Sequence, residues 1–137
     1  MMLKAQGKFI VAPGEARIKL DDDFCRYYRK LVMEYYGETP QEFHLPMYGA
    51  HITVLAKNIH AGVDTTCLGD YNGDTVDFMY DHEIRKGGTQ FTTYYAYVEC
   101  PFAEFVKRKV GFIDPPTFLG LHICVCNNKN KWTNWQT

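Results

Sequence analysis

The pattern of apolar and polar positions predicts two helices in this chain. Within residues 21–37, apolar side chains recur every three or four positions, which is the spacing of one face of an α-helix. These are Phe24, Tyr27, Tyr28, Leu31, Val32 and Tyr35. Three aspartates before the stripe supply N-capping oxygens, and Gly37 is placed to end the helix. A shorter helix is expected over residues 101–110, PFAEFVKRKV, with Gly111 as its stop.

Six stretches rich in β-branched and aromatic residues are expected to form strands. They cover residues 8–11, 17–20, 47–57, 75–80, 90–100 and 119–126. The fourth lies inside an acidic segment, residues 62–83, which contains neither Lys nor Arg. Its carboxylates lack the spacing of an EF-hand, so solvated loops are favoured there over a bound cation. Together the elements predict an α+β fold in a single domain spanning residues 1–137.

Composition and charge narrow the classes of function. Fifteen Lys and Arg face sixteen Asp and Glu, for a net charge of −1. Proteins that hold long duplex nucleic acid by its phosphates carry a clear positive excess, so long duplex is not an expected partner. A small anionic ligand needs only a local positive site. Aromatic residues make up 15% of the chain, which leaves rings for a binding groove beside those in the core.

The sequence also predicts a soluble, cytoplasmic protein. No stretch approaches the roughly 20 apolar residues that span a bilayer, and the N-terminal stretch does not resemble a secretory signal. The five cysteines are unevenly spaced and suggest no disulfide framework, so reduced thiols are expected.

Two histidines share one local pattern. His51 begins HITVLA and His122 begins HICVC, and each closes a strand–helix–strand run in its half of the chain. Alternate residues of a strand face the same side. His51 therefore shares a face with Thr53, and His122 shares a face with Cys124 and Cys126. The repeat predicts a two-lobed fold with approximate internal symmetry that brings the two strands together.

Paired imidazoles suit the cleavage of a phosphodiester. One neutral His removes a proton from the attacking oxygen, and the other, protonated, delivers a proton to the leaving oxygen. Both forms are accessible near neutral pH because an unperturbed His titrates near 6.5. The Thr53 hydroxyl could hold a phosphoryl oxygen, and the arrangement requires no metal and no cofactor.

Other interpretations of these residues stay open. His122, Cys124 and Cys126 could ligate zinc, although the two-residue spacing lacks the usual C-x-x-C knuckle. Either histidine could also be an incidental strand residue. The remaining histidines have no such context and are expected on the surface or in loops: His44, His60 and His82.

The motifs HITVLA and HICVC resemble the paired signatures of the 2H phosphoesterase superfamily. The resemblance implies a bilobal α+β fold, in which two pseudo-symmetric antiparallel-sheet-plus-helix lobes flank a central cleft. It implies that His51 and His122 are catalytic and that Thr53 supplies the first motif hydroxyl. Cys124 stands where Thr or Ser is usual, and a thiol is a weaker donor, so the second phosphate contact is expected to be weaker.

Three longer stretches resemble the phage-encoded branch of that superfamily: PMYGAHITVL, TTYYAYVECPFAEFVKRK and FLGLHICVC. That branch includes enzymes similar to anti-CBASS nucleases, which degrade the cyclic oligonucleotide signals of bacterial defence. The resemblance implies immune evasion in the cytoplasm of a bacterial host.

Substrate contacts are expected from aromatic rings and one cation. Bases stack on aromatic faces, and the candidate rings are those of Tyr48, Tyr94, Tyr95, Trp132 and Trp135. Lys57, at the end of the first motif strand, could reach a phosphate. The expected activity is metal-independent cleavage of a 3′–5′ phosphodiester in a small cyclic oligonucleotide. The alternatives are an RNA-processing enzyme acting on 2′,3′-cyclic phosphates, a non-catalytic protein that sequesters a cyclic nucleotide, and a structural protein with incidental histidines.

Overall fold

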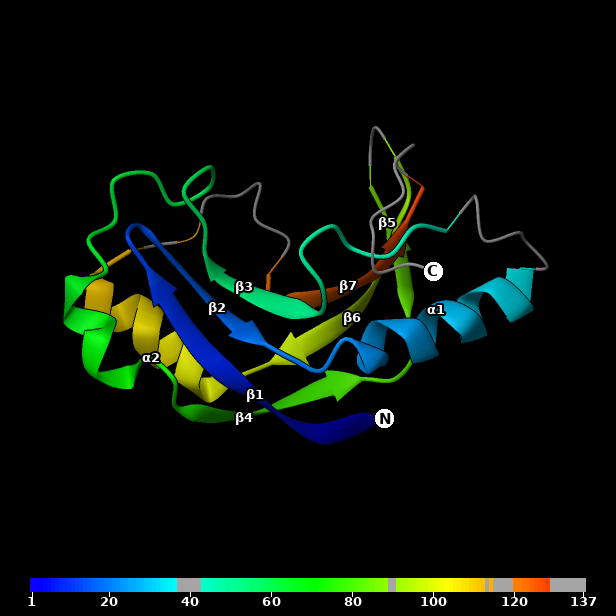
Figure 1. The fold of residues 1–137 in the computed structure, drawn as a ribbon, viewed down its shortest axis with the longest axis horizontal. Helices are drawn as coiled ribbons and strands as arrows, with labels where there is room; N and C mark the ends of the chain where they lie inside the picture. Colours follow the sequence, from blue (N-terminus) through cyan, green and yellow to red (C-terminus); the bar gives the residue numbers. More distant parts are fainter. Residues whose placement is uncertain (37–42, 89–90, 113, 115–119, 129–137) are drawn as a thin grey trace.

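Seven strands, two α-helices and one 3-10 helix form in the residues that the structure, a computed structural model, describes (Figure 1). Those residues are 1–36, 43–88, 91–112, 114 and 120–128. The strands are β1 (Met2–Ala12), β2 (Glu15–Lys19), β3 (His51–Leu55), β4 (Thr75–Asp81), β5 (Arg85–Gly87), β6 (Thr93–Glu99) and β7 (His122–Asn127). The helices are α1 (Asp23–Tyr36), the 3-10 helix η2 (Thr66–Tyr71) and α2 (Pro101–Val110).

All seven strands belong to one antiparallel sheet. Their order is β4-β1-β2-β3-β7-β6-β5, and β4 also pairs with β6, so that six strands close into a barrel and β5 extends it at the edge. The α+β class predicted from the sequence is thereby confirmed. The strand that ends the first half of the chain, β3, lies directly beside β7, which ends the second half.

One row of side chains shows which way the central strands face. Ile18, Ile52 and Ile123 are paired in turn across β2, β3 and β7, and Ala96 of β6 continues the row. All four are completely buried. Since neighbouring residues of a strand face opposite sides, the residues before and after each of them point out of the core.

The two α-helices lie at opposite ends of the molecule (Figure 1). Helix α1 comes from the first half of the chain but packs on β7 of the second half, and the Cys25 thiol donates to the Cys124 carbonyl at 3.2 Å. Helix α2 comes from the second half and contacts β3 of the first half. Each helix therefore ties the two halves together. No helix in the described ranges is long and apolar enough to cross a membrane.

The apolar stripe predicted for α1 is too wide. Its buried residues are Cys25, Tyr28 and Val32, whereas Tyr27 is 60% exposed and Tyr35 is 83% exposed. The helix contacts β7 along one side only. The buried Tyr28 also forms a 2.9 Å hydrogen bond between its hydroxyl and that of Tyr80 in β4, which sets the side of the helix that faces the sheet. The second helix and its left-handed stop at Gly111 are confirmed.

Strand ends differ most from the prediction where pairing is long-range. Strand β1 begins at Met2 instead of residue 8, because it pairs with β4 over seven positions from Met2 to Lys8. Strand β3 is shorter than predicted. In the acidic segment, β4 is confirmed, and η2 forms where only loop was expected.

Candidate functional site

His51 and His122 lie on adjacent strands and on the same side of the sheet. Antiparallel pairing of Ile52 with Ile123 places His51 opposite Cys124 and Thr53 opposite His122, because one step along β3 is one step back along β7. The two histidines are therefore diagonal neighbours, a relation that puts residues roughly 7–8 Å apart in antiparallel sheets. The structure brings together all four residues predicted to be catalytic.

Both imidazoles are held by the same backbone anchor. Nδ1 of His51 lies 2.9 Å from the Gly49 carbonyl oxygen, and Nδ1 of His122 lies 2.9 Å from the Gly120 carbonyl oxygen. A carbonyl only accepts, so each Nδ1–H donates and Nε2 is left as the nitrogen available for chemistry. Both glycines adopt positive φ, 79° and 84°.

This shared glycine is a site feature that the sequence analysis missed. A G-x-H triplet occurs in both motifs, as Gly49-Ala50-His51 and Gly120-Leu121-His122. This spacing is visible in the sequence itself and would identify both anchors.

The first anchor has a second layer of support. Asp22, at the start of α1, accepts hydrogen bonds from the Ala50 amide at 2.9 Å and from the Lys19 ammonium at 2.5 Å. Lys19 also donates to the Ala50 carbonyl at 3.2 Å. Burial alone would raise the pKa of Asp22, but the bonds from Lys19 and Ala50 outweigh it and lower the pKa. The carboxylate thus holds the backbone that positions His51.

The surroundings of His51 favour its neutral form. Burial is the largest cause and lowers the pKa of His51 below its ordinary 6.5, and the hydrogen bond to Gly49 opposes this shift only in part. The positive charges of Arg17, Lys19 and His122 lower the pKa further. The lowered pKa thus favours the unprotonated imidazole, which is the form that can accept a proton.

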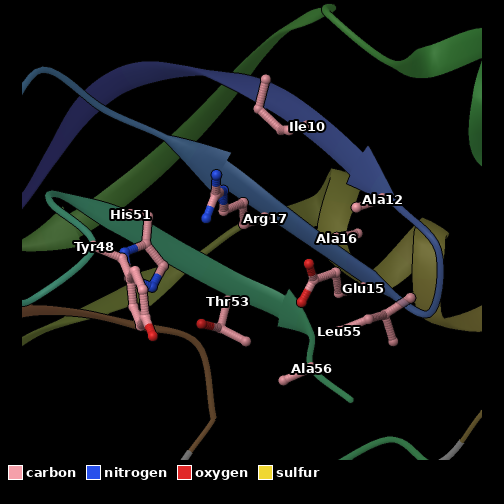
Figure 2. A pocket seen from close by; sticks show the side chains of 10 residues that line it. All are labelled: Ile10, Ala12, Glu15, Ala16, Arg17, Tyr48, His51, Thr53, Leu55 and Ala56. Carbon is pink, nitrogen blue, oxygen red and sulfur yellow. The ribbon is translucent and has the colours of Figure 1, made fainter.

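A pocket of about 400 Å³ adjoins His51 (Figure 2). His51, Thr53 and Tyr48 line it together with Arg17 and Glu15. The rest of its lining is apolar and consists of Ile10, Ala12, Ala16, Leu55 and Ala56. Arg17 was not identified from the sequence, because its place opposite Thr53 depends on how β2 pairs with β3.

On the other side of His122 lies an aromatic ring. The Tyr95 ring meets the imidazole edge to face, with centroids 5.6 Å apart and an interplanar angle of 71°. Tyr95 is paired with Cys124, and Tyr97 is paired with His122. The Cys124 thiol makes a long contact of 3.9 Å with the Cys126 carbonyl oxygen.

The predicted substrate contacts have different outcomes. Tyr48 is 72% exposed and lines the pocket. Lys57 is exposed beside the β1–β2 turn at Gly14 but does not line the pocket. The prediction for Tyr94 is wrong, because its ring is 7% exposed and packs against Phe43 in the core. Trp132 and Trp135 lie outside the described residues.

Two further histidines lie in loops between the named elements, which agrees with the expectation of surface or loop positions, but their side chains are buried. His44 is 5% exposed and His60 is completely buried. Nδ1 of His60 accepts from the Ala56 amide at 3.1 Å, so its protonated Nε2 donates to the Asp114 carboxylate at 2.7 Å. His60 therefore fastens the loop after β3 to the segment after α2. His82 is exposed, as expected.

The face predicted for Cys126 is also wrong. Its side chain is completely buried, because the pairing of β6 with β7 shifts by one residue between Tyr94 and Tyr95 and turns it inward. His122, Cys124 and Cys126 therefore do not share a face. Within the described ranges, no cluster of three or more His, Cys, Asp or Glu side chains could hold a metal ion.

Comparison with known proteins adds no relative. No family model matches the chain, and neither a curated protein nor a solved structure is significantly similar to it.

Proposed function

We propose that this protein is a metal-independent phosphodiesterase that uses His51 and His122 as its acid–base pair. The observation that carries the proposal is the matched anchoring of the two imidazoles. Each donates Nδ1–H to a glycine carbonyl at 2.9 Å, and the two rings stand diagonally across adjacent strands. In the proposed complex, a phosphate bound between the two rings receives one Nε2 from each histidine.

Because its pKa is lowered and its imidazole lines the pocket, we propose that His51 is the base. With a ribonucleotide, Nε2 of His51 takes the proton of the 2′-hydroxyl as the 2′-oxygen attacks the phosphorus. The bond from phosphorus to the 5′-oxygen breaks, and protonated Nε2 of His122 gives its proton to that oxygen. The products are a 2′,3′-cyclic phosphate and a free 5′-hydroxyl. Water then replaces the 5′-oxygen, and the same two histidines act in reverse to open the cyclic phosphate.

Thr53 and Cys124 flank the histidines on the same strands. The Thr53 hydroxyl is directly opposite His122, where it can donate to a phosphoryl oxygen on which negative charge develops. Cys124 occupies the equivalent position opposite His51. Because its thiol is a weak donor, stabilisation on this side is expected to be smaller than a hydroxyl would give.

The two halves of the chain support the expected bilobal arrangement. Strands β3 and β7 have the same burial pattern over their first five residues, and each carries a one-residue shift in pairing at the same distance after its histidine. Each half also sends its helix to the strand of the other half. We therefore propose two pseudo-symmetric lobes of a 2H phosphoesterase-like fold, joined where Ile52 meets Ile123.

Cyclic oligonucleotides of the kind used as bacterial defence signals are the proposed substrates. The resemblance in sequence motivates this class, and the net charge of −1 agrees better with a small ligand than with a long polyanion. Immune evasion by a phage would be the biological role.

The test is mass spectrometry of the purified protein incubated in EDTA with a panel of substrates. The panel holds cyclic di- and trinucleotides, 2′,3′-cyclic mononucleotides and a short RNA. The proposal expects the wild type to cleave cyclic oligonucleotides and a His51→Ala/His122→Ala variant to leave them intact. Cleavage confined to 2′,3′-cyclic ends would replace the proposed substrate with RNA termini. Recovery of an intact but bound cyclic nucleotide would show a sequestering protein, and neither binding nor cleavage would refute the two-histidine argument.

A further inference from the structure

The two sides of the histidine pair are equivalent in geometry but different in chemistry. Position by position, β2 lies beside β3 as β6 lies beside β7. Arg17 is paired with Thr53, and Tyr95 is paired with Cys124 in the corresponding place. The pairing shifts by one residue just before Arg17 on one side and just before Tyr95 on the other. A cation and an aromatic ring therefore occupy matching positions.

The cation on the first side is available to a ligand. Arg17 is exposed, lines the pocket beside His51 and Thr53, and forms no ion pair with a carboxylate in the part of the chain that the structure describes. In Figure 2 its guanidinium lies on the His51 side of the pocket, while Glu15 lies toward Leu55. The neighbouring Lys19 is instead engaged by Asp22 at 2.5 Å.

The second side offers a ring and has its cation engaged elsewhere. Arg85 of β5 stacks over the Tyr97 ring, 4.7 Å from its centroid, and lies 3.6 Å from the Asp81 carboxylate. That contact covers a face of Tyr97. Tyr95 touches His122 by an edge-to-face contact and is only half-buried, so part of this residue stays accessible beside the histidine.

We infer that a nucleotide binds in one orientation across the four central strands, with its phosphate held by Arg17 of β2 and a base stacked on Tyr95 of β6. This inference rests on the proposed function, since it takes the histidine pair as the point where the scissile phosphate sits. A guanidinium binds phosphate oxygens through paired N–H donors. Any base can stack on a tyrosine ring, so this contact sets the orientation of the nucleotide but does not select the base.

The experiment separates the two parts of the ligand and needs no turnover. Inorganic phosphate, adenosine and AMP are titrated separately into ¹⁵N-labelled protein, and amide shifts in two-dimensional NMR spectra give the location and the dissociation constant. Phosphate is expected to shift the amides of Arg17 and Thr53, and adenosine those of Tyr95 and Tyr97. AMP should shift both sets.

Variants test each contact. Arg17→Met should weaken the binding of AMP and of phosphate about tenfold and leave the binding of adenosine unchanged. Arg17→Lys should restore part of the lost affinity. Tyr95→Leu should weaken the binding of adenosine and of AMP at least about fivefold and leave the binding of phosphate unchanged. Tyr95→Phe should bind all three ligands as the wild type does. Lys30→Met and Tyr27→Leu remove an exposed cation and an exposed ring from α1 and serve as matched controls.

The inference is wrong if phosphate and adenosine do not depend on separate residues, Arg17 for phosphate and Tyr95 for adenosine. Equal weakening of phosphate and adenosine by either variant, or shifts of both ligands on the same strands, would contradict it. Native-like spectra of Arg17→Lys and Tyr95→Phe keep the test valid if a larger substitution unfolds the protein. The predicted binding pattern without cleavage of any substrate would refute the proposed function alone, and cleavage without the pattern would refute the inference alone.

Discussion

Replacing Gly49 with alanine tests how the first histidine is anchored. Gly49 has φ of 79°, and its carbonyl oxygen accepts from Nδ1 of His51. A Cβ at this position would lie 2.5 Å from an Asp22 carboxylate oxygen and 2.8 Å from the Lys19 nitrogen. Both distances are too short for non-bonded atoms, so Asp22 or the backbone of Gly49 has to move.

Two costs add up in Gly49→Ala. Holding alanine at positive φ costs about 1–2 kcal/mol. Displacing the Asp22 carboxylate weakens a charge-assisted hydrogen bond to the Ala50 amide, which is worth about 1.5–3 kcal/mol in full and less here because Asp22 is partly exposed. We expect the free energy of unfolding to fall by about 3 kcal/mol.

Two other glycines provide matched controls in urea denaturation. Gly62 and Gly120 have φ of 80° and 84°, and an added Cβ at either would meet nothing within 4 Å. Gly62→Ala and Gly120→Ala should therefore show only the backbone cost, about 1–2 kcal/mol. Of these two, Gly120→Ala alone should also lower kcat, because the Gly120 carbonyl orients His122.

The stabilities and kcat values of these three variants test whether Asp22 supports the turn at Gly49 and whether the glycine carbonyls contribute to catalysis. If Gly49→Ala is no less stable than Gly62→Ala, the Asp22 carboxylate does not hold this turn. If Gly120→Ala and Gly62→Ala have the same kcat, the carbonyl anchor does not contribute to catalysis.

Three further predictions concern chemistry and stability. Cys124→Ser should raise kcat by about three- to tenfold, because a hydroxyl is a stronger donor to a phosphoryl oxygen than a thiol; steady-state cleavage assays measure this, and an unchanged kcat would show that position 124 does not touch the phosphate. Burial, and after it the nearby cations, lower the pKa of His51, so the acid limb of the kcat/KM profile should have its midpoint below pH 6.5. A midpoint of this acid limb above pH 6.5 would contradict the assignment of His51 as base. For the same reason, the free energy of unfolding should fall on acidification from about pH 6.5 down through the lowered pKa of His51, because in that window the unfolded chain binds a proton that the folded chain excludes. His60→Ala should reduce the free energy of unfolding by about 3 kcal/mol, because it removes the hydrogen bonds to Ala56 and Asp114 and leaves a cavity; thermal denaturation with the exposed His82→Ala as control measures it, and equal melting temperatures would contradict a structural role for His60.

The elements that depend on local sequence were predictable. Helix α2 carries its own start and stop in Pro101 and Gly111, and both ends agree with the structure. The faces of His51 and Thr53 followed from strand alternation, which holds from His51 to Val54. Local geometry alone fixes these features.

Features that depend on pairing across the chain were not predictable. Cys126 turns inward because β6 and β7 pair with a shift of one residue, and strand alternation alone puts it on the opposite side. Arg17 reaches the site only because β2 lies beside β3. Tyr94 and Tyr95 are neighbours of the same type, and only the observed register shows that Tyr95 meets His122 and Tyr94 joins the core.

The surface of α1 shows a related gap. The sequence gives no way to distinguish Tyr28, which bonds to Tyr80, from Tyr27, which stays exposed. Both lie at helical spacing in the apolar stripe, and the choice between them depends on where β7 and β4 lie. Amphipathic spacing therefore predicts a helix better than it predicts which edge of the helix is buried.

The most direct test of the central claim is a double-mutant comparison of the two histidines. Single-turnover cleavage of the best cyclic oligonucleotide is measured for wild type, His51→Ala, His122→Ala and the double variant, all in EDTA. If the histidines act as one acid–base pair, the cleavage rate should fall about 10²–10⁴-fold in each single variant. The rate of the double variant should be little lower than that of the slower single variant. Wild-type rates in either single variant would contradict the account.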